Sequence, residues 1–236
     1  MHYFHGDPVE IVHRYDNPKD IEIAAVLCSW VAFGNRKQIH AHCDMLYRIL
    51  QPLPSGYLDS GEWRKHQGSC QNLYRMLFYR DFFDMMQSLA DVYAKYPTLE
   101  DAVIKNINPS VNPQLQYLDA LTRLLHANGI PKDTKSACKR LCLMLRWLVR
   151  RDDDMPAAKR VDFGLWRRLD PSRLLIPLDV HVLKTSRAMG LLNRTTADIK
   201  AAIELTENVR CLFPEDPTVF DFALFTPSIE NKNKHI

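Results

Sequence analysis

Residues 136–150 form a segment that would be apolar on nearly every side if it were a helix. Its apolar side chains surround the helix axis instead of following one face: Leu141, Cys142, Leu143, Met144, Leu145, Trp147, Leu148 and Val149. A helix on the surface of a globular protein keeps a polar face, whereas a helix without one is buried by its neighbours. We therefore expect this helix to lie at the centre of the fold.

The rest of the chain also carries the start and stop signals of helices. Asn17 and Pro18 supply an N-cap and a first-turn proline, and apolar residues then recur at helical spacing until Gly34. Similar signals predict further helices over 36–50, 81–96, 98–107, 113–126, 163–169, 179–189, 195–210 and 216–225, the seventh capped by Thr195 or Thr196. Residues 174–178 are expected to be extended because Pro177 disfavours helical angles before it.

No segment alternates between apolar and polar residues over the length of a strand, so we expect few or no strands. The fold class is therefore all-α, a multi-helix globular fold. A chain of 236 residues suits one large or two small domains. We expect a single helical unit over 1–236; the alternative is two lobes with a cleft between them, about 1–20 plus 160–236, and about 21–159.

Composition excludes several functional classes. Only 8 residues are Gly, and no Gly-rich phosphate loop of the Rossmann or P-loop type occurs. The six Cys show no metal-ligand spacing, which predicts buried free thiols, no structural metal and no cofactor. No stretch reaches the roughly 18 apolar residues of a membrane helix. Residues 1–5 have no signal-peptide character, so we expect a cytoplasmic protein.

The charge is distributed unevenly along the chain. The formal net charge is +3, but residues 132–187 contain 14 Lys and Arg, 7 Asp and no Glu, a net charge of +7. The remainder of the chain carries −4. Such a basic segment fits a surface that meets an anion, most often a nucleic acid. The alternative is a set of solvated helix faces whose cations pair with acids elsewhere in the chain.

Asp179 stands at the start of a predicted helix, directly after the apolar stretch 174–178. The unpaired backbone N–H groups and the positive end of the helix dipole favour its ionised form. An anion held in an apolar setting can be a structural cap or an electrostatic catalyst, and the sequence alone leaves both roles open.

Lys139 and Arg140 lie in the opening turns of the central helix, where the helix dipole disfavours a cation. The dipole and burial together destabilise the ammonium form of Lys139 and favour the neutral amine, which is the form that acts as a nucleophile. The alternative is that Lys139 extends its ammonium group from the helix start into solvent.

Two segments resemble parts of the helix-hairpin-helix DNA glycosylases. Residues 176–182, with Lys184 and Arg187 after them, are similar to the Pro-Val-Asp-Thr-His-Val segment of that superfamily, whose Asp is essential for base excision. Residues 25–29, followed by Asn35 and Arg36, resemble an early helix of the superfamily, whose following loop fills the gap left by a flipped base.

A closer resemblance covers nearly the whole chain. Its motifs occur in order as Asp7-Pro8, 20–24, Phe33-Gly34-Asn35-Arg36, Tyr74-Arg75, 136–141, 145–150, 161–166, 176–181, 204–206, Asp216-Pro217 and 221–225. Together these motifs resemble the bacterial domain of unknown function 2400, a remote relative of the glycosylases.

The resemblance implies a glycosylase-like helical fold, excision of a damaged base by an N-glycosylase with lyase activity, and duplex DNA as the partner. Asp179 falls on the catalytic Asp of the superfamily. Lys139 is the candidate for the lysine that members with lyase activity use. The usual Leu-x-Gly-x-Gly hairpin is absent, and residues 129–134 form the turn in its place, with a single glycine.

Further site residues follow from this hypothesis. DNA contacts are expected from Lys132, Lys135, Arg140, His181, Lys184, Asn35 and Arg36, and a pocket for the flipped base from Trp147, Phe163 and Trp166. Two other functions stay open. One is a DNA-binding module of the same fold without chemistry, and the other is an all-helical domain whose positive face binds an acidic protein. We expect no membrane contact and no obligate protein partner.

Overall fold

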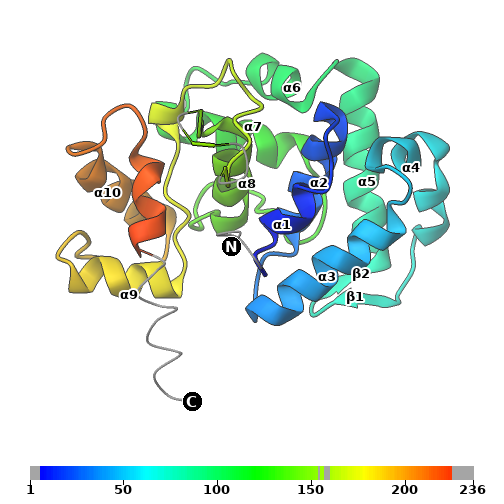
Figure 1. The fold of residues 1–236 in the computed structure, drawn as a ribbon, viewed down its shortest axis with the longest axis horizontal. Coiled ribbons are helices and arrows are strands. Elements are labelled where there is room, and N and C mark those ends of the chain that lie inside the picture. Colours follow the sequence, from blue (N-terminus) through cyan, green and yellow to red (C-terminus); the bar gives the residue numbers. More distant parts are fainter. Residues whose placement is uncertain (1–5, 154, 157–159, 225–236) are drawn as a thin grey trace.

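A computed structural model of the protein describes residues 6–153, 155–156 and 160–224 (Figure 1). This part of the chain is mostly helical, as expected, with one small antiparallel hairpin of β1 (Asn72–Tyr74) and β2 (Leu77–Phe78). The α-helices are α1 (Val9–Val12), α2 (Pro18–Trp30), α3 (Arg36–Ile49), α4 (Pro54–Ser60), α5 (Tyr79–Lys95), α6 (Leu99–Lys105), α7 (Gln116–Leu124), α8 (Lys139–Val149), α9 (Val180–Ala188) and α10 (Ile199–Arg210). Short 3-10 helices are η1 (Glu62–His66), η2 (Pro113–Leu115), η4 (Pro171–Arg173) and η5 (Pro217–Phe220).

Helices α2 and α8 pack against each other at the centre of the fold. Every residue of α2 from Asp20 to Trp30 is buried, and α8 is buried along most of its length, which confirms its predicted central position. Trp30 at the end of α2 donates its indole N–H to the carbonyl of Asn128, at 2.7 Å. This bond fastens the end of α2 to the turn that precedes α8.

The start of α8 differs from the expected position. The helix begins at Lys139 instead of Ser136, because Cys138 has a left-handed φ of 48° that an α-helix cannot include. The residues before it bond to the C-terminal part of the chain. Ser136 pairs with Asp198 in a β-bridge, and the carbonyl of Lys135 accepts a hydrogen bond from the N–H of Ile199 at 3.2 Å.

The helix predicted over 163–169 is wrong. This segment is irregular, since its N–H groups bond to the end of another helix. Phe163 and Trp166 donate to the carbonyls of Trp147 and Leu148, each at 2.7 Å. Carbonyls in the last turn of a helix lack partners within that helix, so the segment completes α8 instead of forming a turn of its own.

The other predicted helices are present with shifted ends. The proline signal at 216–217 starts η5, and helical structure continues over 221–224, whereas Phe225 lies outside the described residues. Helices α1 and α4 and the hairpin were not expected. The six Cys are free, as expected; Cys70 and Cys211, however, are exposed instead of buried.

Helix α10 begins after Asp198, not after Thr195 or Thr196. The Asp198 side chain accepts a hydrogen bond from the N–H of Ala201 at 2.8 Å. Asp198→Ala should therefore lower the free energy of unfolding by about 1 kcal/mol. For a chain of this length that is roughly 2–4 °C in melting temperature. Thr195→Ala and Thr196→Ala should leave the melting temperature unchanged, and equal losses in all three variants would contradict the assignment of the cap.

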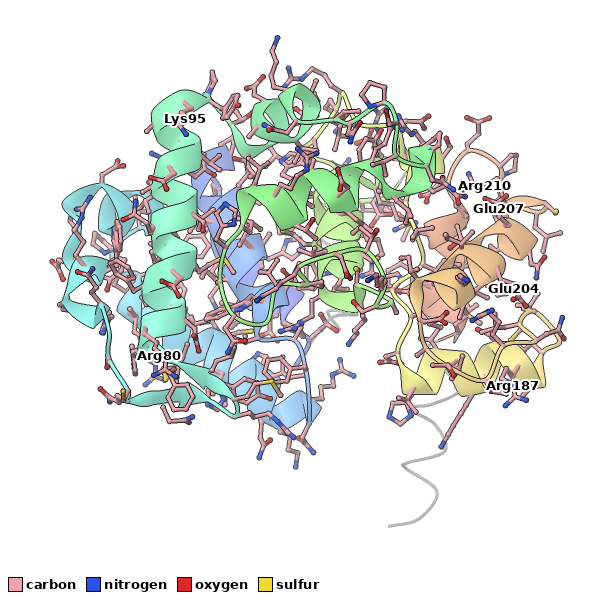
Figure 2. All side chains as sticks on the ribbon, turned by 180° about the vertical axis from the view of Figure 1, so that it is seen from behind. Arg80, Lys95, Arg187, Glu204, Glu207 and Arg210 are labelled. Carbon is pink, nitrogen blue, oxygen red and sulfur yellow. The ribbon has the colours of Figure 1, made fainter. Side chains whose placement is uncertain are left out.

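The C-terminal helices lie at one end of the molecule, away from α5. Figure 2 shows Arg187 on α9 and Glu204, Glu207 and Arg210 on α10 at that end, with Arg80 and Lys95 at the two ends of α5 on the other side. Helix α1 packs against α2 and α3. Helix α1 thus lies with the larger group of helices, although His13, just after it, also contacts the backbone of Val161 at 2.9 Å.

A buried group of charged side chains joins α8 to the segments that follow it. Arg146 pairs with Asp162 at 3.3 Å and with Asp221. Arg150 pairs with Asp152, Asp162 and Asp216 at 2.7, 2.8 and 3.1 Å. Burial lowers the pKa of Arg146, but the carboxylates beside it outweigh burial and hold that pKa above its usual value. We call these six residues the buried ion cluster.

Candidate active site

A cavity of about 420 Å³ lies where the starts of α8 and α9 meet the loop after α2. Its walls are formed by Ala32-Phe33-Gly34, Pro131, Ser136-Ala137-Cys138-Lys139-Arg140 and Asp179-Val180-His181. Three segments that are far apart in the sequence thus contribute to one site.

Lys139 and Asp179 approach each other in this cavity. The Nζ atom of Lys139 lies 3.6 Å from Oδ2 of Asp179 and 3.5 Å from the carbonyl of Ala32. The two side chains are 32% and 24% exposed, so both are accessible yet partly shielded from water. The structure therefore brings together the amine and the carboxylate that the sequence singled out.

The two carboxylate oxygens of Asp179 have different surroundings. Oδ1 accepts hydrogen bonds from the N–H groups of His181 and Val182, at 2.8 and 2.9 Å, and so caps α9. Oδ2 is the atom nearest to Lys139. The structural role and the chemical role that the sequence left open are therefore compatible, since each uses its own oxygen.

The extended segment before α9 fixes the position of Asp179. Residues 174–178 are all buried, and the N–H of Ile176 donates to the hydroxyl of Thr206 on α10 at 3.1 Å. Extended backbone before Pro177 was expected. This buried segment leads directly to Asp179 and so places that side chain in the cavity wall.

Cys138 forms part of the cavity wall next to Lys139. Burial raises the pKa of its thiol, and the side chain is only 4% exposed. A protonated, buried thiol is a poor nucleophile. Lys139 is therefore a better nucleophile than Cys138. The backbone of Cys138 is left-handed, which is rare for a residue other than glycine, and such conformations concentrate at functional sites.

Arg140, expected to contact DNA, forms hydrogen bonds within the protein. Its guanidinium donates to the carbonyl of Trp30 at 2.9 Å and to that of Gly129, and it lies over the ring of Phe33 at 4.9 Å. Burial lowers the pKa of this guanidinium. Arg140 therefore ties α8 to the end of α2 and to the preceding turn, and those bonds leave it poorly placed to hold a phosphate.

The other residues expected to contact DNA fall into different environments. His181 is exposed and lines the cavity. Lys132 and Lys184 are exposed and form no ion pair among the described residues, whereas Lys135 pairs with Asp133 at 3.4 Å. Asn35 caps α3 by accepting from the N–H of Lys37 at 2.9 Å, and Arg36 donates to the carbonyl of Gly6 at 3.1 Å.

None of the three aromatic residues expected around a flipped base lines the cavity. Trp147 and Trp166 are 0% and 1% exposed, and Trp166 donates its indole N–H to Glu22 at 2.6 Å. Phe163 stacks on His13 with 4.2 Å between ring centroids. These three side chains serve the core, and the aromatic ring in the cavity wall is Phe33. Phe33 belongs to the sequence motif 33–36, which predicted a loop that contacts DNA and did not predict a wall of a pocket.

Much of the positive charge of residues 132–187 is paired with carboxylates of the same chain. Arg146 and Arg150 belong to the buried ion cluster. Arg167 pairs with Asp153 at 2.7 Å, and Arg168 pairs with Glu100 and Asp101 at 3.1 and 2.9 Å. Pairing with acids, the alternative from the sequence, thus accounts for these cations, and the basic segment is not one continuous anion-binding surface.

The residues described by the structure contain no group of three or more His, Cys, Asp or Glu side chains placed to hold a metal ion. Among the same residues, no helix is both long and apolar enough to cross a bilayer.

Comparison with protein families gives one match. Residues 7–230 match a family described as "Protein of unknown function (DUF2400)". No curated protein and no solved structure matches the chain.

Proposed function

The chain belongs to the DUF2400 family, whose description names no activity, and we propose that this protein is an N-glycosylase with lyase activity that removes a damaged base from duplex DNA. The observation that carries this proposal is the 3.6 Å approach of Lys139 Nζ to Asp179 Oδ2 inside the cavity. An amine next to a carboxylate is the arrangement that covalent catalysis at a sugar carbon needs.

The chemistry uses both groups in sequence. Lys139 first loses its ammonium proton to solvent, and the amine nitrogen bonds to C1′ of the sugar while the bond from C1′ to the base breaks. Asp179 then accepts the proton that the bonded nitrogen releases, which restores the lone pair of that nitrogen. The base leaves with the bonding electrons and takes up a proton. Positive charge develops on the sugar during this step, and the Asp179 carboxylate stabilises it.

The lyase step follows from the covalent intermediate. The bond between C1′ and the ring oxygen breaks, the oxygen takes up a proton from solvent, and the nitrogen lone pair forms a protonated Schiff base between Lys139 and C1′. Loss of a proton from C2′ then expels the 3′ phosphate and cleaves the strand. The whole sequence needs no redox partner.

Nucleic acid as the substrate is supported by the surroundings of the pair. Exposed Lys132 and Lys184 form no ion pair among the described residues and can hold backbone phosphates. His181 and Phe33 line a cavity of about 420 Å³, which falls within the usual range of sites that enclose a ligand. A base must leave the stack to enter such a cavity.

Covalent trapping tests the role of Lys139 without knowledge of the lesion. Borohydride reduces a Schiff base to a stable bond, so the wild-type protein should form a covalent adduct with a duplex that carries one abasic site. Lys139→Gln should lower the adduct yield by about tenfold or more, because the nucleophile is lost. Adduct yield is measured by gel shift under denaturing conditions.

Lys95→Gln is the matched control, since Lys95 is exposed at the far end of α5 (Figure 2). Its adduct yield should equal that of the wild type. Equal yields for wild type and Lys139→Gln would show that Lys139 is not the nucleophile. Strong duplex binding without any adduct or base release would assign the protein as a DNA-binding module without chemistry.

A further inference from the structure

The turn between β1 and β2 presents an exposed cation next to an exposed apolar side chain. Arg75 and Met76 form this turn, and Met76 is 60% exposed. Arg75 has a left-handed φ of 51°. Side-chain amides hold the turn from two sides: Asn72 donates to the carbonyl of Arg75 at 2.8 Å, and Asn128 donates to that of Met76 at 3.4 Å. We call Arg75 and Met76 the hairpin tip, and the backbone carbonyls of both residues accept hydrogen bonds from side-chain amides.

The hairpin tip is fastened to the wall of the cavity. Tyr74 donates its hydroxyl to the carbonyl of Phe33 at 2.5 Å. Gly34, which lines the cavity, has a φ of 104°, and a Cβ atom there would lie 2.6 Å from Nη1 of Arg75. Only glycine leaves room for the guanidinium at this place. Arg75 therefore lies directly behind the cavity wall, on the side of α3.

Segments that carry cavity-lining residues also carry exposed cations close by in the sequence. Lys37 on the first turn of α3, Lys132 in the loop before α8, and Lys184 on α9 are exposed and form no ion pair among the described residues. Arg75 likewise forms no ion pair with an acid in the part of the chain that the structure describes. Figure 1 shows the hairpin and α3 on one side and α9 on the other. A strand of DNA that delivers a nucleotide to the cavity would meet cations on both sides.

We propose that the hairpin tip is a second DNA contact of this protein, in which Arg75 binds a backbone phosphate and Met76 packs against the bases beside the nucleotide that enters the cavity. This inference rests on the proposed function and extends its substrate contact to an element outside the cavity. Arg is well suited to phosphate because its planar guanidinium can donate two parallel hydrogen bonds. An exposed Met next to that contact suits a widened step between bases.

The chemistry at the tip favours DNA over an acidic protein. The tip pairs one cation with one unbranched apolar side chain, and the other exposed cations lie on separate segments, on α3, before α8 and on α9. A nucleic acid offers phosphates for the cation and stacked bases for the apolar side chain, whereas an acidic peptide offers only carboxylates. Because the turn is already ordered, little conformational entropy is lost on binding.

Binding to duplex DNA measures the contribution of Arg75. The probe is a duplex with one tetrahydrofuran abasic analogue, which cannot form a Schiff base, and affinity is measured by fluorescence anisotropy at several salt concentrations. Asn tolerates left-handed backbone, so Arg75→Asn removes the charge without adding strain. It should weaken binding by roughly three- to tenfold and lower the slope of log K against log salt by about 1.

Met76→Ala tests the apolar part of the tip. The variant should lose about threefold or more affinity for the abasic duplex relative to its loss for an intact duplex. The salt slope should stay unchanged, because no phosphate contact is lost. Met76→Leu should restore affinity. Arg48→Asn is the matched control for Arg75, since Arg48 lies on α3 with a side chain that is 78% exposed, and it should alter neither affinity nor slope.

The outcomes separate this inference from the proposed function. Normal affinity and slope in Arg75→Asn, with Lys139-dependent trapping intact, would overturn the inference and leave the proposed function standing. A lower slope in Arg75→Asn without any trapping would support the contact and overturn the chemistry. Absence of duplex binding by the wild type, with binding to an acidic peptide instead, would overturn both.

Discussion

Asp179→Asn should slow base release from a damaged duplex by about 10²- to 10³-fold while the fold and DNA affinity stay nearly unchanged. The reason is that the two oxygens of Asp179 serve different purposes. An Asn side chain keeps an oxygen that can accept from the N–H groups of His181 and Val182, so α9 remains capped. The negative charge beside Lys139 is lost, and with it the group that stabilises the positive sugar and accepts the amine proton.

The measurement is single-turnover excision from a panel of duplexes that each carry one damaged base, with melting temperature and duplex affinity recorded for each variant. Asp198→Asn is the matched control, because Asp198 is also an N-cap, but of α10, and does not line the cavity. Its excision rate should equal that of the wild type. An unchanged rate in Asp179→Asn would rule out the proposed mechanism.

Arg146→Met should lower the free energy of unfolding by about 3–5 kcal/mol. For a chain of this length the loss is roughly 6–20 °C in melting temperature. Arg146 is 6% exposed and pairs with Asp162 and Asp221. Burial raises the pKa of both carboxyls, and the charge of Arg146 opposes that effect. Without Arg146, two buried carboxyls lose a counter-charge, and one of them must be protonated or hydrated in the core.

Two further variants test whether burial of the ion pairs causes the loss of stability in Arg146→Met. Arg167→Met removes an arginine that also pairs with an Asp, but the side chains of Arg167 and Asp153 are 51% and 52% exposed, so the melting temperature should change little. The double variant Arg146→Met with Asp221→Asn should recover part of the loss, because one unpaired buried charge is then removed. A melting temperature for Arg146→Met equal to that of Arg167→Met would contradict this account.

Local signals in the sequence predicted the helices well. The predicted N-cap Asn17 acts in the structure through its side chain, which accepts a hydrogen bond from the N–H of Lys19 two residues away. The central position of α8 followed from its apolar circumference, and the cap position of Asp179 followed from the extended approach through Pro177. Each of these features depends on neighbours in the sequence, which is why it could be predicted.

Features that depend on distant segments could not be predicted in the same way. The failure of the helix at 163–169 results from bonds to α8, and the pairing of Arg146 with Asp221 joins residues 75 positions apart. The sequence could not show that Trp147 and Trp166 are core residues while Phe33 lines the cavity. The resemblance to the glycosylases suggested that Lys139 lies close to Asp179. The distance between the two side chains depends on how the starts of α8 and α9 are placed in the fold, which the sequence does not show.

The short bridge between residues 135–136 and 198–199 has a consequence for local stability. Lys139 follows closely after one side of this bridge, and the extended segment that carries Asp179 bonds to α10, which begins on the other side. A few backbone hydrogen bonds open far more readily than a packed helical core. Transient opening of this bridge would separate the amine from the carboxylate while α2 and α8 stay folded. The cavity can therefore lose its reactive geometry in a molecule that is still almost entirely native.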